Sequence, residues 1–280
     1  MIVSFGEIGE RLRRSTVGVE LGPNGAGSGV IWDSSGLVIT NAHVAQESRT
    51  VQVALWDGRR YEAQVINRDH PRDLAALRFR APDLTPAEIG DSSKLQAGEI
   101  VIAVGNPLGF TGALSTGVVH AVGPVQGLSP REYVQANVRL MPGNSGGPLA
   151  DSRGRVIGIN AMVASGLALA IPTSAVASFL HGKRRAELGI SVRPVTVRFR
   201  SKMAPGLVIL DVGSGSPAAQ ASLMVGDVIV GSAGKLFQTF DDLSYALELN
   251  DGAVRVQFLR GDRRSIRETT AYVEAKEQAA

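Results

Sequence analysis

The sequence predicts a mainly β protein: an antiparallel barrel or sandwich domain followed by a smaller α+β domain. Two observations predict this. Short apolar runs alternate with turn residues over residues 30–171, and the rhythm changes after about residue 187. Many short strands at near-regular spacing are typical of antiparallel barrels and sandwiches. The length of 280 residues suits two domains of about 100–200 residues each.

Apolar runs separated by Gly, Pro, Asp or Asn predict the elements of the first domain. The expected strands cover residues 30–32, 37–40, 51–55, 61–66, 74–79, 100–105, 115–122, 156–160 and 167–171. The glycine-rich residues 22–29 are expected to form a flexible loop. The first helix is expected at residues 173–180, because Pro172 precedes it, Thr173 can cap it and Gly182 lies just past its end.

The pattern becomes mixed after a polar hinge expected at residues 183–185. Strands are expected at residues 207–210, 227–230, 254–259 and 266–273, and helices at residues 217–223 and 240–249. The predicted domains therefore cover residues 1–182 and residues 187–275.

The composition narrows the range of functions. The chain has no cysteine, which rules out disulfides, thiolate catalysis and cysteine zinc sites. Its net charge is only +3 and its basic clusters lack interleaved aromatic residues, so we expect no nucleic-acid partner. His70, His120 and His181 show no ligand spacing, so no metal is expected. No run of 18 apolar residues occurs, so no integral membrane segment is expected.

The N-terminal residues bear on the compartment. Residues 1–7 lack the basic-then-apolar order of a secretory leader. As written, the chain is expected in the cytoplasm, whereas a trimmed form of a longer chain would be periplasmic or secreted.

The strongest candidate for a catalytic loop is Pro-Gly-Asn-Ser-Gly-Gly-Pro-Leu, residues 142–149. Gly143 and Asn144 permit a tight bend that points consecutive backbone N–H groups into one concavity. Such a concavity beside a nucleophile is the oxyanion hole that acyl transfer requires. The hydroxyl of Ser145 is a weak nucleophile, so it needs a base within hydrogen-bond reach.

His43 is the candidate base, and Asp73 is the candidate for the group that orients it. His43 follows an apolar strand, although a lone histidine there more often has a structural role. Asp73 opens another apolar strand, which it could instead simply cap. The order His, Asp, Ser is that of the chymotrypsin group, and it disfavours an α/β-hydrolase esterase. A cleft between two barrels would bring the three residues together.

These motifs resemble the HtrA/Deg family of serine proteases over nearly the whole chain. Residues 27–31 and 40–44, Gly-Ser-Gly-Val-Ile and Thr-Asn-Ala-His-Val, resemble the histidine segment of that family. Residues 69–77 resemble its aspartate segment, and residues 143–148 its serine segment. The resemblance implies a trypsin-like double β-barrel of two six-stranded barrels, with oxyanion N–H groups on Gly143 and Ser145.

The expected function is an ATP-independent serine endopeptidase that cleaves unfolded or misfolded polypeptides without a cofactor. Ser145 would attack, His43 would move the proton and Asp73 would orient His43. The resemblance also implies a homotrimer built through the protease domain. The alternative is a catalytically silent chaperone or peptide-binding protein on a protease fold.

An apolar specificity pocket is expected from Leu140, Leu167 and Leu169. The residue on the acyl side of the cleaved bond would then be a small or medium aliphatic one, and no aspartate precedes Ser145 to hold Lys or Arg. Arg139 could instead admit an acidic side chain.

The second domain resembles the PDZ domain of the same proteases. Residues 215–229 match the family pattern Gly-Ser-Pro-Ala-x-x-Ala-Gly-Leu-x-x-Gly-Asp-x-Ile, with Ser222 in place of a glycine. Leu188, Gly189 and Ile190 resemble the turn that captures a free C-terminus on backbone N–H groups. C-terminal peptides are therefore expected partners, although the turn could be a plain strand start.

Overall fold

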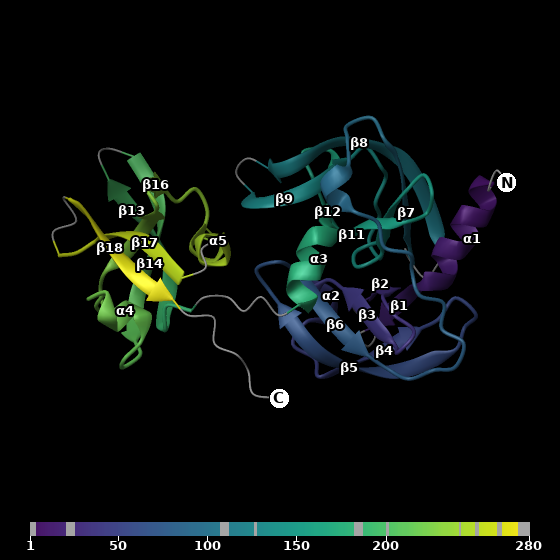
Figure 1. Cartoon of the computed structure of the whole chain (residues 1–280), viewed down its shortest axis with the longest axis horizontal. Helices are drawn as coiled ribbons and strands as arrows, with labels where there is room; N and C mark the ends of the chain where they lie inside the picture. Colours follow the sequence, from purple (N-terminus) through teal and green to yellow (C-terminus); the bar gives the residue numbers. More distant parts are fainter. Residues whose placement is uncertain are drawn as a thin grey trace. The chain divides into compact units, whose positions relative to one another are not determined.

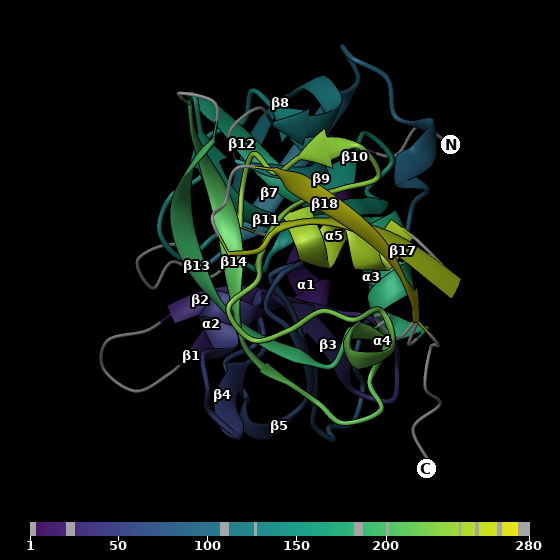
Figure 2. The ribbon, with the colours of Figure 1, turned by 90° about the vertical axis from the view of Figure 1, so that its left-hand side faces the viewer.

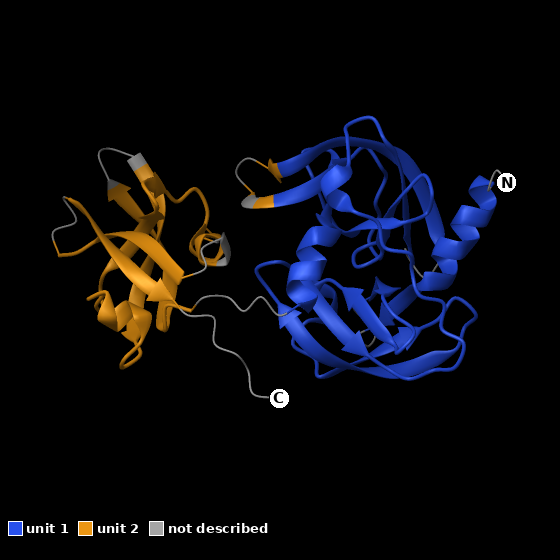
Figure 3. Cartoon of the chain, viewed as in Figure 1, with its two compact units in different colours: residues 1–123, 132–181 blue, residues 124–131, 182–280 orange. Residues whose placement is uncertain are grey.

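The computed structural model describes residues 4–20, 26–106, 112–125, 128–181, 187–199, 202–240, 242–249, 252–261 and 265–273. The chain divides into two compact units, residues 1–123 with 132–181 and residues 124–131 with 182–280 (Figure 3). The hinge expected at residues 183–185, Gly182 and loop residues 22–25 lie outside the described residues, as do the predicted domain ends at 182 and 275.

The first barrel closes through six antiparallel strands (Figure 1). They are β1 (Thr16–Glu20), β2 (Ala26–Ile31), β3 (Leu37–Thr40), β4 (Thr50–Ala54), β5 (Arg60–Asp69) and β6 (Leu74–Arg78). Their order around the barrel is β1-β2-β3-β6-β5-β4. Aliphatic side chains such as Val17, Val53 and Leu77 are fully buried in its core, as expected when alternate residues of each strand face inward.

A second closed barrel of six strands follows. Its strands are β7 (Ile100–Gly105), β8 (Ala113–Val125), β9 (Ser129–Ala136), β10 (Pro148–Asp151), β11 (Val156–Ala164) and β12 (Leu167–Pro172). Their order is β10-β11-β12-β9-β8-β7. Most of this barrel lies in the same unit as the first, but the ends of β8 and β9 within residues 124–131 are grouped with the other unit. A short 3-10 helix, η2 (Ser92–Lys94), precedes this barrel, and α3 (Thr173–Leu180) follows it. The two barrels confirm the mainly β, double-barrel architecture that the resemblance implies.

The structure corrects the expected cap of α3. The helix has the predicted bounds, but Pro172 occupies the N-cap position and Thr173 is the first helical residue. The Thr173 hydroxyl donates to Gly90 O at 2.9 Å instead of capping the helix.

The sequence does not predict the helix α1 (Phe5–Ser15), which precedes the first barrel. Ser4 and Glu7 form a reciprocal capping box at its start. Ile8 and Leu12 are its large buried side chains. Because only two large apolar residues mark the buried face, the helical period is weak in the sequence.

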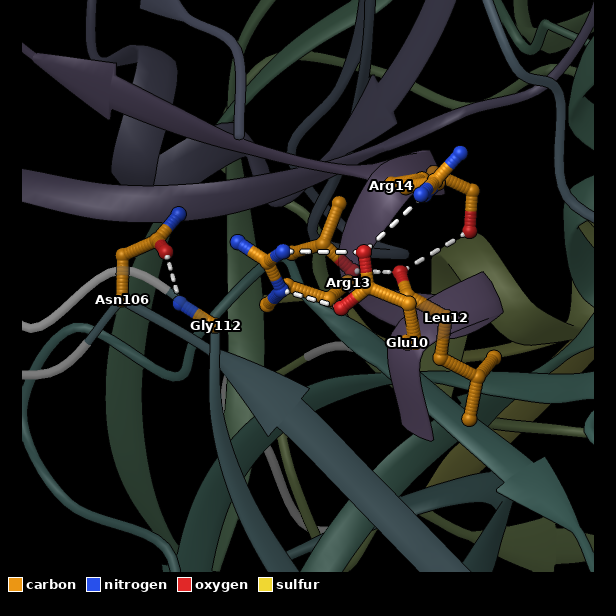
Figure 4. Close-up of polar contacts among 8 residues, drawn as sticks. Glu10, Leu12, Arg13, Arg14, Asn106 and Gly112 are labelled. Atoms are coloured by element: carbon orange, nitrogen blue, oxygen red, sulfur yellow. Dashed lines mark hydrogen bonds and ion pairs between the residues drawn. The ribbon is translucent and has the colours of Figure 1, made fainter. Parts of the chain in front are cut away.

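The C-terminal end of α1 carries a charged cluster (Figure 4). Glu10 accepts hydrogen bonds from Arg13 and Arg14 at 2.8 to 3.0 Å. These bonds hold the pKa of Glu10 at about 2. Both guanidinium groups lie over the ring of Trp56, at 5.0 and 4.9 Å from its centroid.

The glycine-rich residues 26–29 form strand β2, so the loop expected there is wrong for these residues. A Cβ on Gly27 would lie 2.6 Å from Val44 Cγ1, and one on Gly29 would lie 2.7 Å from Val38 Cγ1. These glycines therefore serve close packing inside a strand. The sequence also did not predict strands β1, β9 and β10.

The described residues of the second unit form an antiparallel sheet and two helices (Figure 2). The strands are β13 (Ile190–Phe199), β14 (Lys202–Val212), β15 (Val228–Ser232), β16 (Lys235–Leu236), β17 (Gly252–Leu259) and β18 (Ile266–Val273). Their order is β13-β14-β15-β17-β18, and β16 pairs with β15. The helices are α4 (Pro217–Gln220) and α5 (Asp242–Leu249).

This unit has its own core, in which Ile209, Ile229 and Val254 are fully buried. The helix predicted over residues 217–223 ends at Gln220, shortly before Ser222, whose φ of 57° is left-handed. Strands β13 and β16 were not predicted. No helix within the described ranges is long and apolar enough to cross a membrane.

Candidate active site

His43 and Asp73 lie side by side at one end of the first barrel. His43 belongs to the short helix α2 (Ala42–Ala45), just after β3, and Asp73 directly precedes β6. Strands β3 and β6 are paired, with Thr40 opposite Ala75, so the two side chains meet. His43 Nδ1 is 2.8 Å from Asp73 Oδ2 and 3.0 Å from Oδ1. The His43 backbone N–H also donates to Asp73 Oδ1, at 3.0 Å.

The backbone of Asp73 is left-handed, with a φ of 54°, a conformation that Asp and Asn adopt more readily than most residues. The Asp73 N–H donates to His70 O at 3.0 Å. On the other side, the fully buried Asn41 donates from Nδ2 to Asp73 O at 2.9 Å. Asn41 was not among the residues expected from the sequence, although its place in the Thr-Asn-Ala-His-Val motif was an available signal.

Asp73 determines the electrostatics of His43. Its hydrogen bond raises the pKa of His43 above the usual value against the effect of partial burial, and its negative charge adds to the rise. If Nδ1 donates its proton to Asp73, the neutral imidazole keeps its lone pair on Nε2. The His43 side chain is 50% exposed, so a general base with this tautomer would be open to a reacting group.

Ser145 lies on the loop before β10, in the second barrel. The Asn144 N–H donates to Met141 O at 3.0 Å, which closes a turn just ahead of the serine. Gly143 and Gly146 have φ values of 101° and 86°, where an L side chain would be strained. The glycines on both sides of Ser145 are therefore required by the shape of the loop.

The Ser145 hydroxyl donates to the carbonyl of Ala161, in β11, at 3.0 Å. Within the described part of the chain, no hydrogen bond joins it to His43. The backbone N–H groups of Gly143 and Ser145 have no acceptor among the described residues. The structure therefore pairs His43 with Asp73 and holds the serine hydroxyl in a different bond. Catalytic hydrogen bonds often form only when substrate is bound.

Strand β2 brings the serine loop against the first barrel. The Ser28 N–H donates to Ser145 O at 2.8 Å. A Cβ on Gly27 would lie 2.6 Å from Val44 Cγ1 and 3.1 Å from Ser145 O. Val44, the residue after His43, and the serine loop therefore both lie close to Gly27.

The residues expected to line a specificity pocket differ in exposure. Leu140 is half-buried and packs on the core of the second barrel. Leu167 is also half-buried, whereas Leu169 is only 1% exposed. Leu140 and Leu167 therefore offer more surface to a substrate than Leu169 does. Arg139 is exposed.

In the second unit, Leu188, Gly189 and Ile190 lead into β13. Leu188 O accepts from the Ala218 N–H at 3.0 Å, and Gly189 O accepts from the Gly213 N–H at 2.9 Å. In a trans peptide the N–H points opposite to the C=O. The N–H groups of Gly189 and Ile190 therefore point away from these two donors. Gly189 has a φ of 69°, which suits glycine.

Comparison with known proteins agrees with the double-barrel fold. Residues 27–159 match the model of the trypsin-like peptidase domain. The chain is 35% identical to HhoA of Synechocystis sp., over 86% of this chain and 68% of HhoA. The solved structure of the HtrA-type protease AlgW with a tripeptide has 27% identity and a TM-score of 0.67, and the match covers 99% of both chains.

The chain belongs to the HtrA family of serine proteases. The family match extends to the serine protease HTRA4 of Mus musculus, with 35% identity over 85% of this chain and 55% of that protein. It also includes the Chlamydia trachomatis protein named "Probable periplasmic serine endoprotease DegP-like", with 33% identity over 82% of this chain and 50% of that protein. This HtrA-family chain thus spans from half to about two thirds of the length of these relatives.

Proposed function

We propose that the chain is a serine endopeptidase in which His43, Asp73 and Ser145 form the catalytic triad. The observation that carries the proposal is the His43–Asp73 pair, joined at 2.8 Å between side chains and at 3.0 Å through the His43 N–H. This pairing favours the tautomer that can accept a proton at Nε2. Membership of the HtrA family supports a protease activity.

In the proposed reaction, the Ser145 hydroxyl leaves Ala161 O and turns toward His43 Nε2. His43 takes the proton as Ser145 Oγ bonds to the carbonyl carbon of the substrate. Asp73 stays ionised and stabilises the imidazolium. His43 then gives the proton to the leaving amine as the C–N bond breaks, which leaves an acyl group on Ser145 Oγ. His43 next takes a proton from water, whose oxygen bonds to the acyl carbon, and returns a proton to Ser145 Oγ as the new carboxyl end is released.

The N–H groups of Gly143 and Ser145 receive the negative oxygen of the tetrahedral intermediate. Their lack of an acceptor among the described residues supports this role. A positioned donor of this kind is worth about 10²- to 10³-fold in kcat.

Unfolded or misfolded polypeptides are the proposed substrates, cleaved without ATP by a homotrimer. The half-buried Leu140 and Leu167 favour an aliphatic residue on the acyl side of the cleaved bond. Peptide-library cleavage dominated by basic or acidic residues at that position would contradict this preference. Light-scattering mass measurement tests the trimer.

The second unit is proposed to be a PDZ domain that binds free C-termini. The outward N–H groups of Gly189 and Ile190 would hold the carboxylate. The half-buried Ile190 would contact the last side chain, and Leu188, which is only 3% exposed, would line the floor of that pocket. Edge strand β13 is available for pairing with an extended peptide. Calorimetry with one peptide as acid and as amide tests this. The amide should bind about 10- to 100-fold more weakly, because it cannot form charge-assisted bonds, and equal affinities would refute the proposal.

The central experiment is casein digestion by the wild type and by Ser145→Ala, with fluorophosphonate labelling of both. The proposal expects cleavage and labelling in the wild type alone. A wild type that takes no label and leaves casein intact would favour the alternative, a catalytically silent chaperone. The DegP-like relative is named as periplasmic, which supports a periplasmic or secreted compartment over the cytoplasm, and cell fractionation decides between them.

A further inference from the structure

Ser28, in β2, makes hydrogen bonds to both sides of the serine loop. The residue is fully buried. Its hydroxyl donates to Gly143 O at 2.7 Å, and its backbone N–H donates to Ser145 O at 2.8 Å. One residue therefore holds the carbonyl groups of the two residues whose N–H groups are the proposed oxyanion donors.

The direction of the hydroxyl bond is fixed by its other partner. The Asn106 N–H donates to Ser28 Oγ at 2.9 Å, and an N–H can only donate. The hydroxyl proton is thus left for Gly143 O, which can only accept. The Ser28 carbonyl accepts from the Thr40 hydroxyl at 2.6 Å. Ser28 therefore ties β3 of the first barrel to the segment after β7 in the second.

Gly143 depends on such an anchor because its φ is 101° and glycine restricts its own dihedral angles very little. The peptide that follows Gly143 is held at its oxygen by Ser28 and at its N–H by Met141 O. With both ends of this peptide held, ψ of Gly143 is fixed, and a change in that ψ would alter the orientation of the Gly143 N–H relative to the Ser145 N–H. The Ser28 hydroxyl opposes that rotation.

The polar connection continues from Ser28 toward α1. The Gly112 N–H donates to Asn106 Oδ1 at 2.7 Å, as the dashed line in Figure 4 shows. Arg13, which is bonded to Glu10 in the same view, packs against Gly112 so closely that a side chain on Gly112 would collide with it. Helix α1 thus supports the segment whose backbone fixes the Ser28 hydroxyl.

We propose that Ser28 is a positioning residue that keeps the Gly143 and Ser145 N–H groups aimed at the oxyanion. This inference rests on the proposed function, since it assigns Ser28 a task within that reaction. If the inference is right, removing the Ser28 hydroxyl lowers turnover more than removing an equally buried hydroxyl elsewhere in the chain.

The test compares Ser28→Ala with a matched control, Thr173→Val, in the full chain. Thr173 is also buried, and its hydroxyl also donates to a backbone carbonyl, Gly90 O, and accepts from a backbone N–H, that of Ser92. Each variant leaves one backbone carbonyl and one backbone N–H without the hydroxyl as hydrogen-bond partner, so the two variants should lose similar thermal stability. The readouts are kcat and KM with fluorescein-labelled casein, the fluorophosphonate labelling rate and Tm.

Ser28→Ala should lower kcat by about 10- to 100-fold and leave KM within about threefold, because misaimed donors weaken transition-state binding rather than substrate binding. Thr173→Val should keep kcat within about twofold. Ser28→Cys, with its weak S–H donor, should fall between wild type and Ala, and it decides the matter if Ser28→Ala does not fold.

An active wild type together with an equally active Ser28→Ala, or equal losses of kcat in Ser28→Ala and Thr173→Val, would overturn this inference alone. A wild type that neither cleaves casein nor takes the fluorophosphonate would overturn the proposed function and the inference with it.

Discussion

In the first barrel, His43 and Asp73 are joined through both backbone and side chain. In the second barrel, the Ser145 hydroxyl donates to Ala161 O and, within the described residues, to no atom of His43. The proposed base and its orienting carboxylate are thus already paired in this structure, whereas the proposed nucleophile, Ser145, would have to exchange its bond to Ala161 O for one to His43 before it could react.

The two halves are also held by different means. His43 and Asp73 flank paired strands, β3 and β6, so the barrel itself sets their separation. The serine loop has left-handed glycines on both sides of Ser145 and is bonded to distant residues such as Ser28. The geometry of the serine loop therefore depends on contacts with residues distant in the sequence, whereas that of the His43–Asp73 pair depends on the pairing of adjacent strands.

The largest expected effect comes from removing the nucleophile. Ser145→Ala should lower casein hydrolysis by about 10⁶-fold, because triad members act as a unit, while Tm stays near that of the wild type. His43→Ala should cost about as much. Cleavage of casein by Ser145→Ala at a measurable fraction of the wild-type rate would remove Ser145 from the mechanism.

A smaller loss of turnover is expected from changing Asp73, the partner of His43 in the first barrel. Asp73→Asn keeps a residue that tolerates a φ of 54°, but its amide would favour the wrong tautomer of His43. Turnover should fall by about 10⁴-fold, by analogy with the general triad. Near wild-type turnover in this variant would show that the His43–Asp73 pair has only a structural role.

Asn41 and Asn160 allow a matched comparison of the two barrels. Both are fully buried, and each donates from Nδ2 to a backbone carbonyl at 2.9 Å, Asn41 to Asp73 O and Asn160 to Pro148 O. Asn41→Ala should lower kcat by about tenfold and shift the acidic limb of the pH–rate profile, because Asp73 loses its anchor. Asn160→Ala should lose comparable stability without that shift. Identical pH profiles would contradict the role given to Asn41.

The smallest expected effect concerns the pH at which activity falls on the acidic side of the pH–rate profile. The hydrogen bond to Asp73 raises the pKa of His43 above its usual value, and only neutral imidazole can act as the base. Activity should therefore fall as the pH drops through the raised pKa of His43, and Asp73→Asn should move that midpoint to lower pH. The pH dependence of kcat/KM measures this midpoint in the wild type. NMR titration of the His43 imidazole measures it in Asp73→Asn, whose turnover is slow. A midpoint in Asp73→Asn that is not below that of the wild type would be inconsistent with the role given to the observed pair.

Much of the barrel architecture could be predicted from short-range patterns. The strand at residues 100–105 and the helix at residues 173–180 were predicted with their observed bounds, because apolar runs and breakers are local signals. Helix α1 was missed because Ile8 and Leu12 alone mark its buried face. Residues 26–29 were expected to form a loop because their glycines look flexible, yet they pair with residues 17–20 of β1, and the absence of a Cβ on Gly27 and Gly29 leaves room for Val44 and Val38.

The sequence by itself determined the family, the types of residue in the proposed triad and their order along the chain, because each is carried by contiguous motifs. The tertiary structure decided that Ser145 bonds to Ala161 O, that Asn41 anchors Asp73 and that Ser28 binds Gly143 O. In these three contacts the acceptor is a backbone carbonyl, a group that every residue carries. Residue type cannot specify which carbonyl is reached, and only the packing of strands distant in the sequence selects the partner.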